Sequence, residues 1–501
     1  MKYMRLLGIV AVAAWLGICG LRPGLTKASI ADDATGNIVF LASVWSNSSG
    51  TVETPPPDTQ EGERTLFLPM VANRYDATLA TPLFGVQMYG NTDKTSLYYP
   101  SLIASKASWV RVPIVWSDVE PSNVSPDKFR WTGADAAIGV ARDGGLNLIV
   151  TLDSAPGWAA TYPSGPIDKV GYEELSEFVR AVIERYDGDG VDDAPGLPVI
   201  NYWEFYNEPD LGQRYTDVRW GNAGAEYAKM LAAVYPVVKA ANPNAQVVFG
   251  GIAYDWFVED GGPFVRGFLD DVLKAGGGRY FDVMNFHSYP NFAPNWATQG
   301  AGLYEKAQFI QKKLHDEYGL EKPLVVTEAG MHSNDAPQLP MTPELQAQYV
   351  VRLFTQSMAA NLQVMIWFMF YDPGSFYPFD NGLVTSDDPP QTKVAFNAYQ
   401  TIVSELSTAH FERILTADET GATDMEAYRF RDNVKKQVVY VAWLNPDRTQ
   451  ETKPLKLPAT QVLVRDIYGS MRAANDADDG VIDGMTTVEV SSQPVYIEVR
   501  Q

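Results

Sequence analysis

The chain has 501 residues, a net charge of −22, a hydrophobic content of 46% and one cysteine. This length exceeds one ordinary domain and predicts two or three folded units. The acidic balance argues against nucleic acid and anionic membranes as partners. Because Cys19 is the only cysteine, we expect no disulfide, no thiolate nucleophile and no cysteine-based zinc site in the mature chain.

The N-terminal segment, residues 1–31, has the layout of a secretory signal peptide. Lys2 and Arg5 precede an apolar run over residues 6–21, and small residues follow it. We therefore expect a secreted protein, with cell-surface attachment left open and no stable membrane insertion after cleavage. An uncleaved membrane anchor and a lipoprotein that carries lipid on Cys19 are the alternatives.

The rest of the chain divides into three parts. Residues 32–78 are polar and Pro-bearing, which predicts a flexible linker. Over residues 79–405, short apolar runs alternate with longer amphipathic runs. The eight predicted strands are 83–88, 108–115, 146–152, 198–206, 245–250, 281–287, 323–328 and 363–369.

This alternation predicts the α/β class, as a parallel (β/α)8 TIM barrel. An open doubly wound sheet is the alternative, but the first predicted strand ends in Gln87-Met88-Tyr89-Gly90 without the Gly-rich phosphate loop of such sheets. Over residues 406–501, closely spaced strands separated by turns predict an all-β sandwich domain.

Chemistry-bearing side chains gather at the carboxyl ends of the predicted barrel strands, where such barrels place their active sites. Two of them are carboxylates, Glu208 just after the fourth strand and Glu328 at the end of the seventh. Cleavage of a glycosidic bond needs one carboxylic acid to protonate the leaving oxygen and a second carboxylate to attack the anomeric carbon. We therefore predict Glu208 and Glu328 as a catalytic pair. The predicted substrate-binding residues around them are Arg111, Asn207, His287, Tyr289, Trp367, Trp116, Asp153 and Trp158.

Several of these residues have a predicted role. Arg111 and Tyr289 are candidate partners for an ionised Glu328, through charge and hydrogen bonding. Asn207 is placed to hold the sugar 2-hydroxyl. Trp367 offers a flat face for a sugar ring, and so do Trp116 and Trp158, which follow the second and third strands closely.

Five segments resemble the signature segments of clan A glycoside hydrolases, in order and spacing. They are WVRVPIVWSDVEP (109–121), YWEFYNEPD (202–210), NFHSYP (285–290), LVVTEAG (324–330) and VMIWF (364–368). The resemblance implies that Glu208 is the acid/base and Glu328 the nucleophile of a retaining mechanism. The C-terminal β-domain is similar to that of family 39 and some family 5 members.

The third strand departs from this pattern. Several clan members place a sugar-contacting His at its end, whereas this chain has Leu152-Asp153-Ser154 and then Trp158. We expect Asp153 or Trp158 to fill that space. The identity of the sugar stays open, with β-glucoside, β-mannoside, β-xyloside and β-galactoside as candidates, and so do exo or endo action and the oligomeric state.

Rival chemistries have little support in the sequence. The four histidines lie far apart and no G-x-S-x-G occurs, which argues against a metal-dependent hydrolase and a serine hydrolase. We therefore expect a carbohydrate substrate and no metal or cofactor. A catalytically silent carbohydrate-binding surface protein on the same fold is the alternative function. The acidic loop 187–193 resembles a calcium loop but lacks the EF-hand pattern, so bound calcium is left open there; residues 476–480 are a weaker candidate.

Overall fold

A computed structural model describes residues 83–89, 96–212, 218–289, 302–336, 339–374, 377–446 and 449–500. The predicted signal peptide (1–31) and linker (32–78) lie outside the described residues. None of the helices in the described part of the chain combines the length and the apolar character needed to cross a bilayer.

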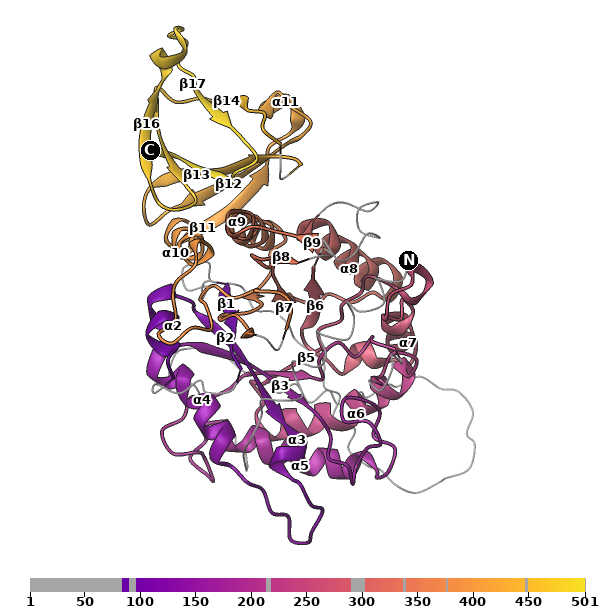
Figure 1. Ribbon diagram of the computed structural model, residues 1–501. Coiled ribbons are helices and arrows are strands. Elements are labelled where there is room, and N and C mark those ends of the chain that lie inside the picture. Colours follow the sequence, from indigo (N-terminus) through magenta and orange to yellow (C-terminus); the bar gives the residue numbers. More distant parts are fainter. Residues whose placement is uncertain are drawn as a thin grey trace, which may run out of the picture. The chain divides into compact units, whose positions relative to one another are not determined.

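Eight parallel strands form the barrel (Figure 1), which confirms the predicted fold class. Their order around the sheet is β5-β4-β3-β2-β1-β10-β7-β6, and parallel bridges from Val248 to Val283 and from Ile252 to Phe286 join the two edges. The strands are β1 (Phe84–Gln87), β2 (Trp109–Val115), β3 (Asn147–Asp153), β4 (Tyr202–Phe205), β5 (Gln246–Val248), β6 (Met284–Ser288), β7 (Leu324–Ala329) and β10 (Val364–Trp367).

Helices between the strands surround the barrel (Figure 1). Local chemistry sets their ends: α4 and α8 stop where Gly145 and Gly319 take left-handed φ values, and the Thr342 hydroxyl caps the start of α9. The helices are α2 (Tyr99–Ser105), α3 (Trp116–Val119), α4 (Thr132–Gly144), α5 (Tyr172–Arg185), α6 (Gly224–Ala241), α7 (Phe268–Lys274), α8 (Leu303–Tyr318), α9 (Pro343–Ala359) and α10 (Val394–Leu406). Short pieces are the 3-10 helices η2 (Val258–Asp260) and η3 (Gly277–Arg279) and the ribbon of β8 (Asp335–Ala336) with β9 (Leu339–Pro340).

The barrel interior changes from apolar to polar along the strands. An apolar layer includes Trp109, Ile149 and Val325. Side chains two residues apart on a strand point to the same face, so the next inward positions belong to residues two further along. These positions form a polar layer of buried side chains, namely Gln87, Arg111, Thr151, Glu204, Asn285 and Thr327. The polar layer lies directly beneath the carboxyl ends of the strands.

The C-terminal domain consists of a six-stranded antiparallel sheet, ordered β11-β12-β13-β18-β15-β16, and the two-stranded sheet β14-β17. Side chains of β13 alternate between two cores: Tyr440 and Ala442 face the core that includes Leu455 and Val488 of the small sheet, whereas Trp443 joins the core of the barrel helices. The elements are β11 (Ala409–Ile414), α11 (Ala417–Thr420), β12 (Met425–Asp432), β13 (Gln437–Leu444), β14 (Lys453–Leu457), β15 (Gln461–Asp466), β16 (Met471–Asn475), η7 (Asp476–Asp479), β17 (Thr486–Val490) and β18 (Val495–Arg500).

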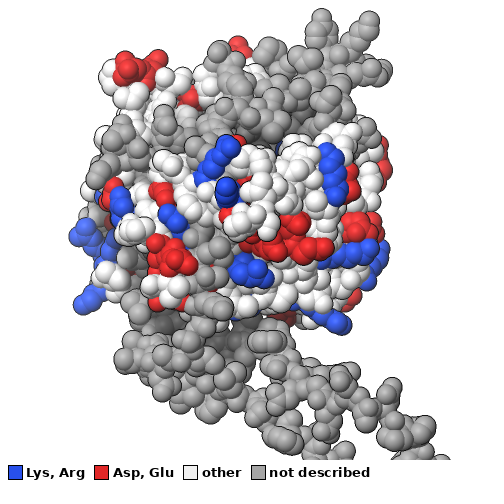
Figure 2. Space-filling model, turned by 90° about the horizontal axis from the view of Figure 1, so that it is seen from below, with Lys and Arg blue, Asp and Glu red and all other residues white. Residues whose placement is uncertain are grey.

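Charged side chains of both signs occur on the molecular face shown in Figure 2. Acidic and basic groups are interspersed there and adjoin one another in several places. The described atoms of this face therefore form no continuous basic surface.

Candidate active site

Glu208 and Glu328 lie together at the mouth of the barrel. One oxygen of each carboxylate and one ring nitrogen of His287 lie within 4.8 Å of one another. Both side chains are largely buried, with 12% of Glu208 and 9% of Glu328 exposed. Retaining glycosidases hold their carboxyl groups about 5–5.5 Å apart and inverting ones about 6.5–9.5 Å apart, so this short separation suits the retaining mechanism.

The backbone at the end of β4 is bent so that consecutive side chains can both reach the site. Successive residues of a regular strand point to opposite faces. Here Tyr206 and Glu208 take φ values of 64° and 45°, on either side of Asn207. Such values are costly for residues other than glycine and are found mainly where function requires them. The bend is held by a 3.0 Å hydrogen bond from the Glu208 N–H to the Gly251 carbonyl.

An irregularity in β7 has the same effect on the opposite side. The pairing of β6 with β7 shifts register so that His287 pairs with Glu328, and the pairing of β10 with β7 shifts in the same region. A bulge of this kind changes the direction of the side chains that follow it. As a result, the neighbours Thr327 and Glu328 both contact groups of the site.

Arg111 connects the polar layer to the carboxylates. Its Nη1 donates to Glu328 Oε1 at 2.8 Å, and its Nε and Nη2 donate to the two oxygens of Glu204 at 2.7 and 2.9 Å. Burial lowers the pKa of Arg111, but the charges of Glu204 and Glu328 outweigh burial and raise that pKa above its ordinary value, so the guanidinium remains cationic. The remaining acceptors of Arg111 are Asn207 Oδ1, Gln87 Oε1 and Thr151 Oγ1.

Glu204 is a central residue of the site that the sequence analysis did not identify. Its side chain is fully buried and accepts hydrogen bonds from Arg111, Thr151, Asn285 and the Gly251 N–H. The other polar-layer residues, apart from Arg111, were missed with it. The available signal was a polar residue inside each of several otherwise apolar strands, because a buried polar side chain needs partners inside the barrel.

Glu328 is surrounded by hydrogen-bond donors. The Tyr289 hydroxyl donates to its Oε2 at 3.1 Å, opposite the contact with Arg111. Burial first, and then the charges of Glu328 and Glu208, raise the pKa of the Tyr377 phenol. Arg111 and Tyr289 donate to different oxygens of Glu328 and so hold its carboxylate in one orientation.

His287 lies between Glu208 and the polar layer. Its Nδ1 is 3.1 Å from Glu208 Oε1, and its Nε2 is 3.2 Å from Thr327 Oγ1. Burial, together with the nearby charge of Arg111, lowers the pKa of the imidazole to about 4. The ring is therefore neutral near pH 7. By ligand type Glu208, His287 and Glu328 could together hold a cation, but the guanidinium of Arg111 already occupies Glu328.

The prediction that Trp367 is a sugar platform is wrong. Its side chain is fully buried in the core between barrel and helices, and its indole N–H donates to the Asn381 carbonyl at 3.0 Å. Inward positions on β10 are Val364 and Ile366, so Trp367 points away from the barrel axis. The aromatic residue on the site side is Phe368, whose ring contacts Tyr289 edge-on at 6.3 Å.

The aromatic residues after β2 and β3 also differ from the prediction. Trp116 is 2% exposed, stacked on Phe178 and edge-on to Trp158, so it has no face for a sugar. Trp158 keeps part of its surface exposed while its indole donates to the Glu120 carbonyl at 3.0 Å. Its contact with substrate stays a prediction.

Asp153 holds the backbone of the site residue Asn207. It is buried, and its Oδ2 accepts the Asn207 N–H at 3.1 Å while its Oδ1 accepts the Ser154 N–H. Burial raises the pKa of this carboxyl to about 6, against the lowering effect of Arg219. Because its oxygens bind the backbone, Asp153 positions Asn207 and does not take the place of a sugar-contacting histidine.

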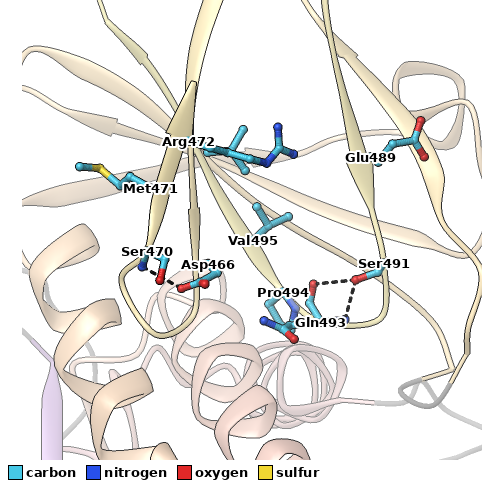
Figure 3. A pocket seen from close by; sticks show the side chains of 10 residues that line it. Asp466, Ser470, Met471, Arg472, Glu489, Ser491, Gln493, Pro494 and Val495 are labelled. Atoms are coloured by element: carbon cyan, nitrogen blue, oxygen red, sulfur yellow. Dashed lines mark hydrogen bonds between the residues drawn. The ribbon is translucent and has the colours of Figure 1, made fainter. Parts of the chain in front are cut away.

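A further pocket of about 360 Å³ lies in the C-terminal domain (Figure 3). Asp466, Arg472 and Glu489 provide its charged groups, and Ser470 and Gln493 lie on turns at its edge. Its lining contains no aromatic residue. Its two carboxylates lie on different strands, Asp466 at the end of β15 and Glu489 in β17, and Asp466 accepts the N–H groups of Tyr468 and Ser470. The pocket therefore lacks a stacking platform, and one of its two carboxylates is already bound to the backbone.

Comparisons with known proteins agree with this geometry. Residues 75–372 match the family Cellulase (glycosyl hydrolase family 5), whereas no curated protein matches the chain. A family 39 glycoside hydrolase from the gut symbiont Bacteroides cellulosilyticus WH2 has a similar structure, with a TM-score of 0.60 and 18% identity over 84% of this chain and 81% of that one. A glucosidase from Croceicoccus marinus has a TM-score of 0.58 and 16% identity over 84% and 96%. A GH51 alpha-L-arabinofuranosidase from Thermotoga petrophila RKU-1 has a TM-score of 0.55 and 11% identity over 84% and 98%.

The family match and the barrel fold define a clan A glycoside hydrolase, a retaining glycosidase. This confirms the predicted class of enzyme. Within that class, the chain belongs to glycosyl hydrolase family 5, the Cellulase family, whose match covers more than half of its length.

Proposed function

We propose that this glycosidase cleaves β-glycosidic bonds of an oligo- or polysaccharide, with Glu208 as acid/base and Glu328 as nucleophile. The observation that carries the proposal is the short distance between two carboxyl groups that have different partners. Glu328 is held by two donors, Arg111 and Tyr289, which suits an ionised nucleophile. Glu208 instead lies beside a neutral imidazole.

The hydrogen bonds of His287 support a protonated Glu208 in the resting enzyme. Thr327 Oγ1 has a single proton, which is directed to Glu204 or to Asn285 Oδ1. Its remaining capacity is to accept, so His287 Nε2 carries the ring proton and donates it to Thr327. His287 Nδ1 is then a lone pair, and its contact with Glu208 needs a proton on Glu208. A carboxylic acid in this position can protonate a leaving oxygen.

The reaction then follows in two steps. Glu328 attacks the anomeric carbon while Glu208 gives its proton to the glycosidic oxygen, and the bond to the leaving sugar breaks. Glu208, now a carboxylate, takes a proton from water as that water attacks the glycosyl-enzyme and releases Glu328. Two inversions leave the anomeric configuration retained.

Asn207 is placed to assist both steps. Its Oδ1 accepts from Arg111 at 2.7 Å, which orients its amide NH2 as the group available to substrate. A donor there can bind the 2-hydroxyl of the sugar, a contact that strengthens in the transition state. Phe368, Tyr289 and Tyr89 form the apolar cluster on the site side of β10 and supply surface for the ring.

Hydrolysis of a panel of aryl glycosides tests this function. We expect at least one β-glucoside, β-mannoside, β-xyloside or β-galactoside to be cleaved with retention, observed as the first anomer formed in NMR spectra. Glu328→Gln should lose at least ~10³-fold in rate. An α-L-arabinofuranoside as the sole substrate would overturn the β-linkage. Inversion would overturn the mechanism, and glycan binding without turnover would support a silent binding protein.

The secreted location is part of the proposal and rests on residues 1–31. Expression of the full chain with its N-terminal segment tests it. We expect activity in the medium or at the cell surface and a chain shortened at about residue 31. Activity confined to the cytoplasm would contradict the proposed location.

A further inference from the structure

We propose that Arg219 is a positioning residue of the reaction, which holds the Asn207 main chain so that the Asn207 amide meets the 2-hydroxyl of the sugar. This role rests on the proposed function, because it concerns a contact with the sugar that is cleaved. Arg219 comes from the connection between β4 and α6, outside the five segments that resemble clan A enzymes. Its role follows from where the fold brings its side chain.

Arg219 binds the main chain of Asn207 directly. Arg219 is buried, and its Nη1 donates to the Asn207 carbonyl. The N–H of the same residue is bound by Asp153, whose Oδ2 accepts it at 3.1 Å. The N–H and the carbonyl of Asn207 are thus each bound by a buried, charged side chain, and such hydrogen bonds are roughly twice as strong as those between neutral groups.

The main chain needs this support because Asn207 stands between two residues of unfavourable conformation. Tyr206 and Glu208 take φ values of 64° and 45°. Backbone of this kind persists only where the surrounding structure holds it in place. Relaxation toward a regular strand would turn the Asn207 side chain away from the site, since successive side chains of a strand point to opposite faces.

The segment that carries Arg219 is itself well packed. The next residue, Trp220, is fully buried and lies edge-on to Tyr206, with the ring centroids 5.1 Å apart. Gly221 lies so close to Gly212 that a Cβ on Gly221 would come within 2.6 Å of the Gly212 Cα. Arg219 therefore reaches the Asn207 carbonyl from a fixed base.

Charge compensation explains why an arginine serves here. Burial raises the pKa of the Asp153 carboxyl to about 6, and the charge of Arg219 acts in the opposite direction. A buried charge is costly unless an opposite charge compensates it. A neutral donor in place of Arg219 could bind the Asn207 carbonyl but would not offset the charge of Asp153.

The support acts on Asn207 more than on the neighbouring Glu208. Arg111 Nη2 holds Asn207 Oδ1 at 2.7 Å, so the direction of the amide NH2 depends on the main chain staying in place. Glu208 has a separate hold, since its N–H donates to the Gly251 carbonyl at 3.0 Å. Loss of Arg219 should therefore weaken the contact with the 2-hydroxyl and leave the acid/base nearly in place.

Kinetics on two matched substrates test this role. They are the 4-nitrophenyl glycoside that the parent cleaves and its 2-deoxy counterpart, which lacks the hydroxyl that Asn207 binds. We expect Arg219→Met to lower kcat about 10²-fold on the first substrate with little change in KM, because the contact strengthens in the transition state. On the 2-deoxy glycoside the same variant should lose less than about threefold in kcat.

Three further variants separate positioning from general damage. Arg219→Lys keeps the charge and a donor, so it should restore at least about a tenth of the parent rate. In an Asn207→Ala chain, Arg219→Met should cost almost nothing more, because the group that it positions is already absent. Arg266→Met removes a half-exposed arginine that pairs with Asp260 and should leave the rates on both glycosides unchanged.

Thermal unfolding shows whether Arg219→Met is folded. The variant leaves Asp153 buried without its compensating cation, which lowers stability. If Arg219→Met does not fold, the doubly substituted Asp153→Asn, Arg219→Met chain takes its place. It removes both charges and keeps an acceptor for the Asn207 N–H, and it should show the same dependence on the 2-hydroxyl.

Equal losses on the two glycosides, or a full loss in the Asn207→Ala chain, would overturn the role, because Arg219 would then act on the fold or on Glu208. Parent rates for Arg219→Met on both glycosides would overturn it as well. A failure of the proposed function is seen in the parent instead. A parent that inverts the anomeric configuration, or cleaves no β-glycoside, would overturn that function and the role of Arg219 with it.

Discussion

Arg111 and Glu204 form a buried ion pair inside the barrel, and each of them has several further hydrogen bonds. Both are almost wholly inaccessible, with exposed side-chain fractions of 2% and 0%. Such a pair is stable only when further hydrogen bonds satisfy the remaining atoms, and here the polar layer provides them. The pair fixes the guanidinium that in turn orients Glu328 and Asn207.

Glu204→Gln should therefore destabilise the fold strongly. The amide would turn an NH2 donor toward groups that are donors themselves and would remove one of the two buried carboxylates that pair with Arg111, at a cost of about 3–5 kcal/mol. Urea unfolding measures this cost. Asp143→Asn removes an exposed partner of Arg142 and should cost less than about 1 kcal/mol. Equal costs for the two variants would show that the buried pair has no special role.

His287 should remain neutral well below neutral pH. Its pKa in the folded chain is about 4, below the ordinary 6.5, so this group adds stability that is complete above pH 6.5 and is lost as the pH falls toward 4. NMR titration of the histidine rings, assigned with His287→Gln, should show no change of its signal near pH 6. The exposed His315, whose pKa its hydrogen bond to Asp316 raises, should titrate above 6.5. Titration of His287 at 6.5 or higher would contradict the neutral state that we assign to this ring.

At the scale of elements, strand ends and close packing place the site. β5 approaches β6 and β7 so closely that a Cβ on Gly251 would lie 2.2 Å from His287 Nε2 and 2.9 Å from Thr327 Oγ1. The glycine leaves the space that the imidazole occupies. The Gly251 N–H donates to Glu204 Oε1 at 3.1 Å. The backbone at Gly251 therefore cannot move away without losing this hydrogen bond.

Gly251→Ala should reduce kcat by about 10²-fold through displacement of His287, since a shift of about 1 Å in a catalytic group has this effect. Steady-state kinetics on the cleaved glycoside measure it. Gly267→Ala is the control, because a Cβ there meets nothing within 4 Å. Unchanged kcat in Gly251→Ala would show that the position of His287 does not limit the reaction.

The alternation of apolar and amphipathic runs predicted the strands and helices of the barrel well, because both patterns follow from which side chains are buried. It also placed Glu208 and Glu328 near the carboxyl ends of strands, which is where β4 and β7 have them. The orientation of Trp367 was not predictable in this way. Which residues of β10 point into the barrel depends on its pairing with β7, and the register of that pairing shifts between Met365 and Trp367. In the β-domain, apolar runs predicted β13, β15, β17 and β18, whereas β11, β12, β14 and β16 were missed. Of these, the edge strands β11 and β16 expose much of their surface, as is usual for edges.

At the scale of the whole chain, the C-terminal sheet has two buried faces. One face forms its own core with β14 and β17, and the other, with Tyr428 and Trp443, joins the core of the barrel helices. Arg352 of α9 bridges the two, with its Nη2 donating to the Ser492 carbonyl at 2.7 Å and its guanidinium 5.6 Å from the Trp443 ring. We therefore expect barrel and sheet to unfold together.

Calorimetry should show one transition for the described domains. Trp443→Ala should lower the Tm of that whole transition, because loss of a buried Trp costs about 3–5 kcal/mol. Met471→Ala, at a residue of β16 that is 56% exposed, should change it little. Two separate transitions, with only the smaller one moved by Trp443→Ala, would show that the sheet is an independent domain.

The central claim concerns the division of labour between Glu208 and Glu328. Its most direct test is mass spectrometry of Glu208→Gln incubated with a dinitrophenyl glycoside of the cleaved sugar. Such a leaving group needs no proton, so Glu328 should still attack, while the second step stalls without a base. We predict one sugar bound covalently to Glu328 and none in the doubly substituted Glu208→Gln, Glu328→Gln chain. A sugar attached to another residue, or hydrolysis by Glu208→Gln as fast as by the parent, would contradict the account.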